Sequence, residues 1–203
     1  NRVVLDPTTT LTIAQYLYLL NSSLEIVNSD LLLNAWAKIY SSLSNDTTLS
    51  SFNSNKCIIN SGSSSNVLLG GHIVRKFPNT LSLPQMFQFP IGTPGYYSPA
   101  EIELRASRAT FGSNPEISIK PVDKEHPQVE VNNKSLTKYW VVNSNDININ
   151  GSGANVFFHY NAGEVNGNEA AYDVLYFSPS YNNPLGYWRL DPGNDNDIVD
   201  FNQ

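Results

Sequence analysis

The chain has 203 residues and a formal net charge of −6, and only 15% of its residues are charged, whereas about 25% is usual for a globular protein. Its twelve Lys and Arg residues form no basic run, which argues against a nucleic-acid partner, because such binding depends on neutralising phosphates. No stretch approaches about 18 consecutive apolar residues, so the sequence predicts no membrane span.

Amide and hydroxyl side chains replace charge on the surface. The chain contains 26 Asn and 23 Ser, nearly a quarter of all residues. The single cysteine, Cys57, excludes an intrachain disulfide and a cysteine-based zinc site. The chain begins at Asn1 without a charged segment and an apolar run after it, so we expect any signal peptide to have been removed. This composition favours an extracellular setting.

Residues 1–83 consist of short apolar clusters separated by polar steps. Asn, Ser, Asp and Thr recur roughly every 7–9 residues, and their side chains favour turns because they bond to the nearby backbone. The pattern predicts a ladder of short strands over 1–83, and similar strands stacked on one another would form a small parallel β-roll.

A helix is the rival interpretation for part of this block. Ile13, Tyr16, Leu17 and Leu20 have the i, i+3, i+4, i+7 spacing of an amphipathic face. The polar steps recur too often for helices of about 10–12 residues, so strands are favoured. One helix near 30–44 remains open as an alternative.

The sequence changes character from about residue 84, where proline and aromatic residues become frequent and the alternating runs lengthen. Turn signals rich in Gly, Asn and Pro, such as 111–115, separate these runs. Strands at this spacing are typical of an antiparallel β-sandwich, which we predict for 84–203 within an all-β protein. The expected strands are 86–90, 100–106, 116–121, 128–131, 136–142, 155–160, 171–177 and 186–190.

Three segments carry a resemblance to a known group of proteins. Residues 71–77 read Gly-His-Ile-Val-Arg-Lys-Phe, residues 87–93 read Phe-Gln-Phe-Pro-Ile-Gly-Thr with Tyr-Ser-Pro following at 97–99, and residues 136–142 read Leu-Thr-Lys-Tyr-Trp-Val-Val. These segments resemble motifs of large secreted surface proteins of Bacteroidota-type bacteria, which are often exported by the type IX route. The resemblance implies a strand ladder before the motifs and a role as an adhesin, fibre or scaffold on the cell surface.

Both ends of the chain carry a short apolar strand candidate. Such a strand can close its own sheet or add to the edge of a neighbouring molecule, and a head-to-tail contact that does not close produces a filament. We therefore predict an extracellular structural protein that forms a homo-oligomer or filament, or serves as an adhesin module. The residues expected to make these contacts are Val3, Val4, Leu5, Ile198, Val199 and Phe201.

A carbohydrate-binding module is the alternative function. Flat aromatic side chains near predicted loops can stack on sugar rings, and the candidates are Tyr181, Tyr187 and Trp188, with Tyr96 and Tyr97 as further ones. A dense group of oxygen ligands close to these residues would suit Ca²⁺, although an acidic exposed end of the domain explains the same residues without metal. The calcium candidates are Asp191, Asn194, Asp195 and Asp197.

The sequence offers little that is typical of an enzyme. No nucleophile elbow, zinc-protease motif or phosphate loop is present. His72, His126 and His159 stand far apart in the chain, and Glu101 and Glu103 share a strand face that we expect to point to solvent. We predict a protein without catalytic activity and without a cofactor other than the calcium ion considered above.

Overall fold

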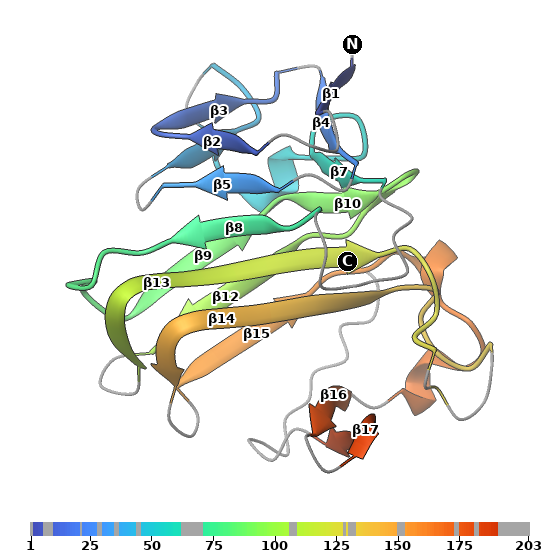
Figure 1. Ribbon diagram of the computed structural model, residues 1–203. Helices are drawn as coiled ribbons and strands as arrows, with labels where there is room; N and C mark the ends of the chain where they lie inside the picture. The colour runs from blue at the N-terminus through green and yellow to red at the C-terminus, as the bar shows by residue number, and fades with distance from the viewer. Residues whose placement is uncertain are drawn as a thin grey trace.

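The computed structural model of the protein (Figure 1) shows an arrangement of stacked sheets. The structure describes residues 2–5, 10–20, 22–27, 30–34, 37–43, 46–61, 71–105, 109–127, 129, 133–149, 153–172, 175–180 and 183–190. Within these, only the backbone is described for the strands at 2–5, 175–180 and 183–190.

The all-β prediction is confirmed. The helical elements of the described residues are three short 3-10 turns, η1 (Leu49–Ser51), η2 (Ala162–Glu164) and η3 (Glu169–Ala171). The alternative of a helix near 30–44 is wrong, because β5 (Leu31–Leu33) and β6 (Lys38–Tyr40) occupy this stretch. Each of these strands pairs with a neighbour, and this tertiary pairing overrides the local helical spacing.

The first forty residues wind twice through the same three sheets. The first coil consists of β1, β2 and β3, which pair in parallel with β4, β5 and β6 of the second coil, respectively. Paired residues lie 20 to 22 positions apart, as in Leu11 with Leu31 and Tyr16 with Lys38, so the structural repeat is a whole three-strand coil and not the 7–9-residue step. The new strands are β1 (Arg2–Leu5), β2 (Leu11–Ile13), β3 (Tyr16–Tyr18) and β4 (Ser23–Ile26).

Strand β8 connects these coils to the rest of the molecule. It pairs in parallel with β5 and antiparallel with β13, which gives a five-stranded sheet in the order β14-β13-β8-β5-β2. A second sheet runs β1-β4-β7-β10-β11. Strands from both sides of the predicted boundary at residue 84 therefore share both sheets. The new strands are β7 (Ile58–Asn60), β8 (Ile73–Lys76), β10 (Ile91–Thr93), β11 (Tyr96–Tyr97), β13 (Ala109–Val122) and β14 (Tyr139–Ile149).

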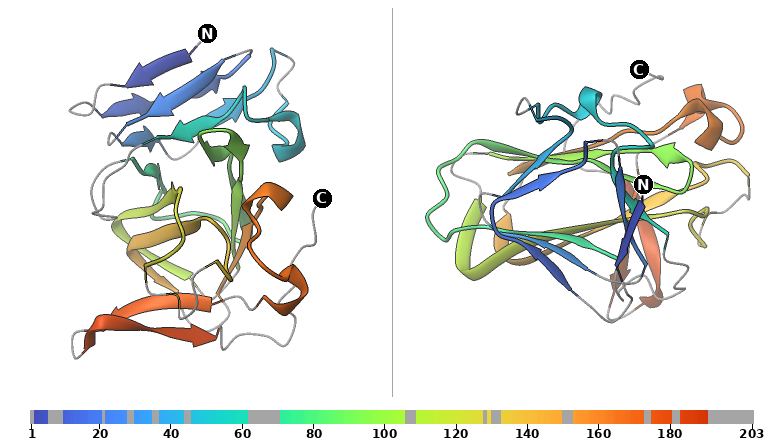
Figure 2. Two further views of the ribbon diagram at one scale, coloured as in Figure 1. Left: turned by 90° about the vertical axis from the view of Figure 1, so that its right-hand side faces the viewer. Right: turned by 90° about the horizontal axis from the view of Figure 1, so that it is seen from above.

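The larger, antiparallel part has sandwich-like packing. A sheet ordered β15-β12-β9 lies against the β14-β13-β8 layer (Figures 1 and 2). Trp140 of β14 stacks on Phe158 of β15 with ring centroids 4.7 Å apart, and buried apolar side chains from both layers form one cluster with those of the coils. The strands of this second layer are β9 (Gln85–Phe89), β12 (Ala100–Leu104) and β15 (Ala154–Phe158).

Several details depart from the expected strands. The strand predicted at 128–131 lies mostly outside the described residues, and the one predicted at 136–142 begins at Tyr139. The strand predicted at 171–177 begins later, as β16 (Leu175–Ser180), which pairs antiparallel with β17 (Asn183–Leu190), because η3 occupies 169–171. The turn predicted at 111–115 is an irregularity inside β13, between Phe111 and Glu116. There the Asp146 carboxylate accepts a hydrogen bond from the Asn114 backbone N–H at 2.7 Å.

Candidate functional site

Apolar side chains of the first coil are less buried than those of the second coil among the described residues. Leu11, Ile13 and Leu17 are only partly buried, although the residues paired with them in the second coil, Leu31, Leu33 and Ile39, are at most 5% exposed. The first coil thus covers the second, and no described residue covers the first to the same degree. This end of the coils, defined by Leu11, Ile13 and Leu17, is called the open end below.

The backbone at the open end also has a free strand edge. Among the described strands, β1 and β2 are each last in their sheets, and β3 pairs with β6 alone. On β2, the Leu11 N–H donates to the Asp30 carbonyl at 3.3 Å, and the Ile13 carbonyl accepts from the Asn34 N–H at 3.0 Å. Because successive residues of a strand direct their backbone groups to opposite edges, those of Thr12 face away from β5.

Three tyrosines form an aromatic cluster beside the open end. Tyr16 and Tyr18 of β3 are 55% and 43% exposed. Tyr40 of β6 is buried beneath them, stacked on Tyr18 at 5.0 Å between ring centroids. These residues, Tyr16, Tyr18 and Tyr40, are called the tyrosine cluster. Sequence reasoning missed it, although the alternation Tyr-Leu-Tyr at 16–18 is the period-two signal of a strand with an outward aromatic face.

The residues predicted for assembly fall partly within the described chain. Val3, Val4 and Leu5 lie on β1, where their pairing partners are Leu24, Glu25 and Ile26 of β4 in the same molecule. The outer edge of β1 has no described strand beside it. The other three predicted assembly residues, Ile198, Val199 and Phe201, lie outside the described residues.

The predicted glycan and calcium residues are mostly beyond the described chain. Tyr187 and Trp188 lie on β17, opposite Ser178 and Phe177 of β16. Tyr97 donates its hydroxyl hydrogen bond to the Leu49 carbonyl at 2.8 Å; burial raises its pKa, so its hydroxyl is engaged in the fold. Tyr181, Asp191, Asn194, Asp195 and Asp197 lie outside the described residues, and among those described no group of three or more His, Cys, Asp or Glu is arranged to hold a metal.

The three histidines do not converge on one site. His72 lies against Asp30, with Nδ1 3.4 Å from a carboxylate oxygen. His126 packs edge-on against the Tyr139 ring, and His159 Nε2 lies 3.1 Å from the Glu101 carboxylate.

The two carboxylates on β12 have separate partners. Glu103 accepts a hydrogen bond from the Asn155 amide at 2.6 Å and lies 3.6 Å from the Arg105 guanidinium. Glu101 accepts from the Gln88 amide at 3.3 Å. The contacts with Asn155 and Gln88 are ordinary cross-strand pairs.

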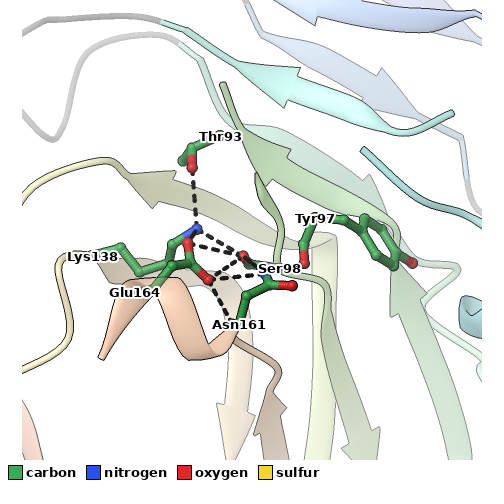
Figure 3. A network of polar contacts seen from close by, with 6 residues as sticks. All are labelled: Thr93, Tyr97, Ser98, Lys138, Asn161 and Glu164. Atoms are coloured by element: carbon green, nitrogen blue, oxygen red, sulfur yellow. Dashed lines mark hydrogen bonds and ion pairs between the residues drawn. The ribbon is translucent and has the colours of Figure 1, made fainter. Parts of the chain in front are cut away.

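The strongest polar cluster is buried between the two layers of the antiparallel part. Lys138 and Glu164 form an ion pair, and both side chains are fully shielded from solvent (Figure 3). The Lys138 ammonium also donates to the Ser98 hydroxyl at 2.7 Å and to the Thr93 hydroxyl at 3.1 Å. Every hydrogen of the ammonium therefore has an acceptor, as a buried charge requires.

Asn161 completes this cluster on the Glu164 side. The Glu164 carboxylate accepts the Asn161 backbone N–H at 2.8 Å and its side-chain amide at 3.1 Å. The same amide donates to the Tyr97 carbonyl at 2.8 Å and lies 3.4 Å from the Ser98 hydroxyl oxygen. The five residues Thr93, Ser98, Lys138, Asn161 and Glu164 are called the buried network.

Electrostatics in the buried network acts on Lys138 in two opposing directions. Removal from water lowers the pKa of Lys138 from its usual value, and the hydrogen bond and charge of Glu164 oppose this change. The sequence signal that points to Glu164 is Asn161-Ala162-Gly163-Glu164, the spacing of a capping box at the start of a helical turn.

Comparisons with known proteins add no assignment. No family model matches the chain, and neither the curated proteins nor the solved structures that we searched include a match. No helix among the described residues has the length and apolar character needed to cross a membrane.

Proposed function

We propose that the protein is an extracellular structural protein, a surface-filament subunit or adhesin module, that associates with copies of itself through the open end. The observation that carries this proposal is the difference in burial between the two coils. Leu11 and Ile13 are partly buried where Leu31 and Leu33 are fully buried, so a further strand layer on the first coil would remove apolar surface from water.

The backbone of β2 also favours the addition of a strand from a second copy. An incoming strand at β2 would meet the outward donor and acceptor of Thr12, and pairing to a strand edge supplies main-chain hydrogen bonds without requiring a particular sequence. A second copy of this chain carries the same edge on its own β2, and pairing of these two edges gives a two-fold dimer as the first step of assembly. Low charge density, with only 15% charged residues, limits repulsion between copies at close range.

The experiment measures the oligomeric state by light scattering across a concentration series, with electron microscopy of the same samples. Thr12→Pro removes the outward N–H of β2 while leaving the bonds of Leu11 and Ile13 to the second coil in place. Ile13→Glu places a charge on the apolar surface of the open end. Both variants should shift the protein toward monomer.

The matched control is Met86→Glu, which places the same charge on an exposed apolar residue of β9, away from the first coil. It should assemble like the unmodified protein, and circular dichroism establishes that each variant is folded. A protein that stays monomeric at every concentration, or an assembly unaffected by both first-coil variants, would refute the proposal.

Carbohydrate binding is the second candidate, and the tyrosine cluster favours it. Tyr16 and Tyr18 expose rings whose centroids lie 6.2 Å apart on one strand face, and apolar sugar faces pack against such rings. A glycan array probes this function directly. Tyr16→Ala and Tyr18→Ala should each reduce any signal, whereas Phe157→Ala, an exposed aromatic residue of β15, should retain it.

A further inference from the structure

The buried network holds the three groups needed for an amide-exchange reaction inside the protein. These groups are the amine of Lys138, the side-chain carboxamide of Asn161 and the carboxylate of Glu164 (Figure 3). We propose that Lys138 and Asn161 form an intramolecular isopeptide bond, with Glu164 transferring the proton. This inference does not depend on the assembly proposed above.

The reacting side chains of Lys138 and Asn161 both contact the same two residues, Glu164 and Ser98. One oxygen of Glu164 contacts the Lys138 Nζ, and the other accepts a hydrogen bond from the Asn161 Nδ2 at 3.1 Å. The Ser98 Oγ lies 2.7 Å from Nζ and 3.4 Å from Nδ2. Holding both groups against the same partners lowers the entropic cost of bringing them together.

The surroundings favour nucleophilic attack by the lysine. A neutral amine is the nucleophile, and burial that lowers the pKa of Lys138 helps to produce it. The adjacent Glu164 carboxylate can accept the ammonium proton directly. The Lys138 and Glu164 side chains are fully shielded from solvent, so the attacking amine and its proton acceptor meet away from water, whereas the Asn161 side chain is partly exposed.

The reaction balances without an outside reagent. Glu164 takes a proton from the Lys138 ammonium, and the Nζ lone pair forms a bond to Cγ of Asn161. Glu164 then returns the proton to Nδ2 as the Cγ–Nδ2 bond breaks, and ammonia leaves. The second proton of the amine leaves with the ammonia as ammonium, so the product is a neutral amide with no change in oxidation state.

The bond would join the two layers of the antiparallel part. Lys138 immediately precedes β14, whereas Asn161 lies between β15 and η2, and β14 and β15 belong to different sheets. A covalent bond between the layers would resist forces that pull the sheets apart. It would also replace the buried charge of Lys138 by a neutral amide.

The test is the intact mass of the purified, folded protein after extended incubation at neutral pH. The cross-linked protein is lighter by one ammonia molecule, and protease digestion yields one branched peptide that contains both Lys138 and Asn161. The proposal would be overturned if the folded protein kept the mass calculated from its sequence, or if it lost ammonia without yielding that branched peptide. The second outcome includes cyclisation of an asparagine on its own backbone, which does not involve Lys138.

Variants separate the roles of the three residues. Lys138→Arg and Asn161→Ala should each keep the mass calculated from their own sequence. Glu164→Gln should lose ammonia at least tenfold more slowly than the unmodified protein, since proton transfer typically contributes about 10²–10⁴-fold to the rate. The matched control is Lys124→Arg, an exposed lysine outside the buried network, which should cross-link as the unmodified protein does. A branched peptide containing Asn161 that persists in Lys138→Arg would contradict the assignment.

Discussion

The ammonium of Lys138 and the carboxylate of Glu164 meet between two sheet layers where neither side chain reaches solvent. Their sequence positions are 26 residues apart, and the contact brings the start of β14 to the turn that follows β15. Thr93 and Ser98 supply the remaining acceptors from the β10–β12 region. The pair therefore fixes the relative position of three segments of the chain.

Removing Glu164 should strongly destabilise the fold. Glu164→Ala leaves the Lys138 charge buried without its counter-charge, and breaking a buried pair in this way costs about 3–5 kcal/mol of the free energy of unfolding. Urea denaturation at neutral pH measures this change.

The matched control for this prediction is Glu103→Ala. Glu103 lies 3.6 Å from Arg105, and both side chains of that pair are partly exposed, so its loss should cost at most about 1 kcal/mol. Equal destabilisation by the two variants would show that the buried pair contributes no more to the free energy of unfolding than the partly exposed pair.

The sequence predicts the strand content well because alternation is a local property. In β12, Ala100, Ile102 and Leu104 are buried, and Glu101 and Glu103 between them are not, as the period of two requires. The coil repeat is harder to predict, because each pairing joins residues about 20 positions apart, and its spacing varies from 20 to 22 between Leu11–Leu31 and Tyr16–Lys38.

The buried network could not be predicted for a different reason. Ser98 lies 66 positions from Glu164 and 40 from Lys138, and each residue alone has the character of an ordinary surface side chain. Only the tertiary fold buries them together. Asn161 and Glu164 do carry a local signal, the capping-box spacing, but that signal predicts a helical turn and says nothing of Lys138.

Arg75 on β8 provides a test of whether a buried cation contributes to stability. Its guanidinium donates to the Ala37 carbonyl at 2.9 Å and lies 5.8 Å from the centroids of the Phe87 and Phe89 rings. Burial lowers its pKa to about 10, which reflects the cost of removing the charge from water.

Replacement of Arg75 by an apolar side chain of similar length should therefore be tolerated. We expect Arg75→Met to change the free energy of unfolding by less than about 1.5 kcal/mol, because the methionine fills the space without a desolvation cost. Arg75→Ala should cost about 2–5 kcal/mol through the cavity it leaves. Equal losses in the two variants would indicate that the charge, and not the volume, stabilises this position.

Gly92 and Gly112 should respond differently to the same substitution. A Cβ at Gly92 would lie 2.3 Å from the Tyr96 backbone oxygen, whereas one at Gly112 would lie 2.0 Å from the Asp146 carboxylate. The backbone of the β10–β11 hairpin cannot yield locally, so Gly92→Ala should cost at least about 1–3 kcal/mol.

A side chain can move where backbone cannot. Gly112→Ala should displace Asp146 and lose its hydrogen bond from the Asn114 N–H, at a cost of about 1 kcal/mol. In an Asp146→Ala background the same substitution should cost less. Thermal unfolding of the four proteins in this cycle measures the coupling, and additive effects would contradict the proposed contact.

Stability in acid should depend on Asp30. Its carboxylate accepts the His72 backbone N–H at 2.9 Å and lies beside the His72 ring. The hydrogen bond from the His72 side chain is the main cause that lowers the pKa of Asp30 below its usual 3.8, with a smaller contribution from the charge of Lys120. A carboxyl whose pKa is lower in the folded state stabilises the protein above the unfolded-state pKa.

This contribution should disappear as the pH falls through the lowered pKa of Asp30. Asp30→Asn should therefore be less stable than the unmodified protein near pH 7, and the difference should shrink as the pH is lowered below 3.8. Urea denaturation midpoints at several pH values measure it. A difference that stays constant across this range would mean that the substitution acts through packing, because an effect on charge must vanish once the carboxyl is protonated in both the folded and unfolded states.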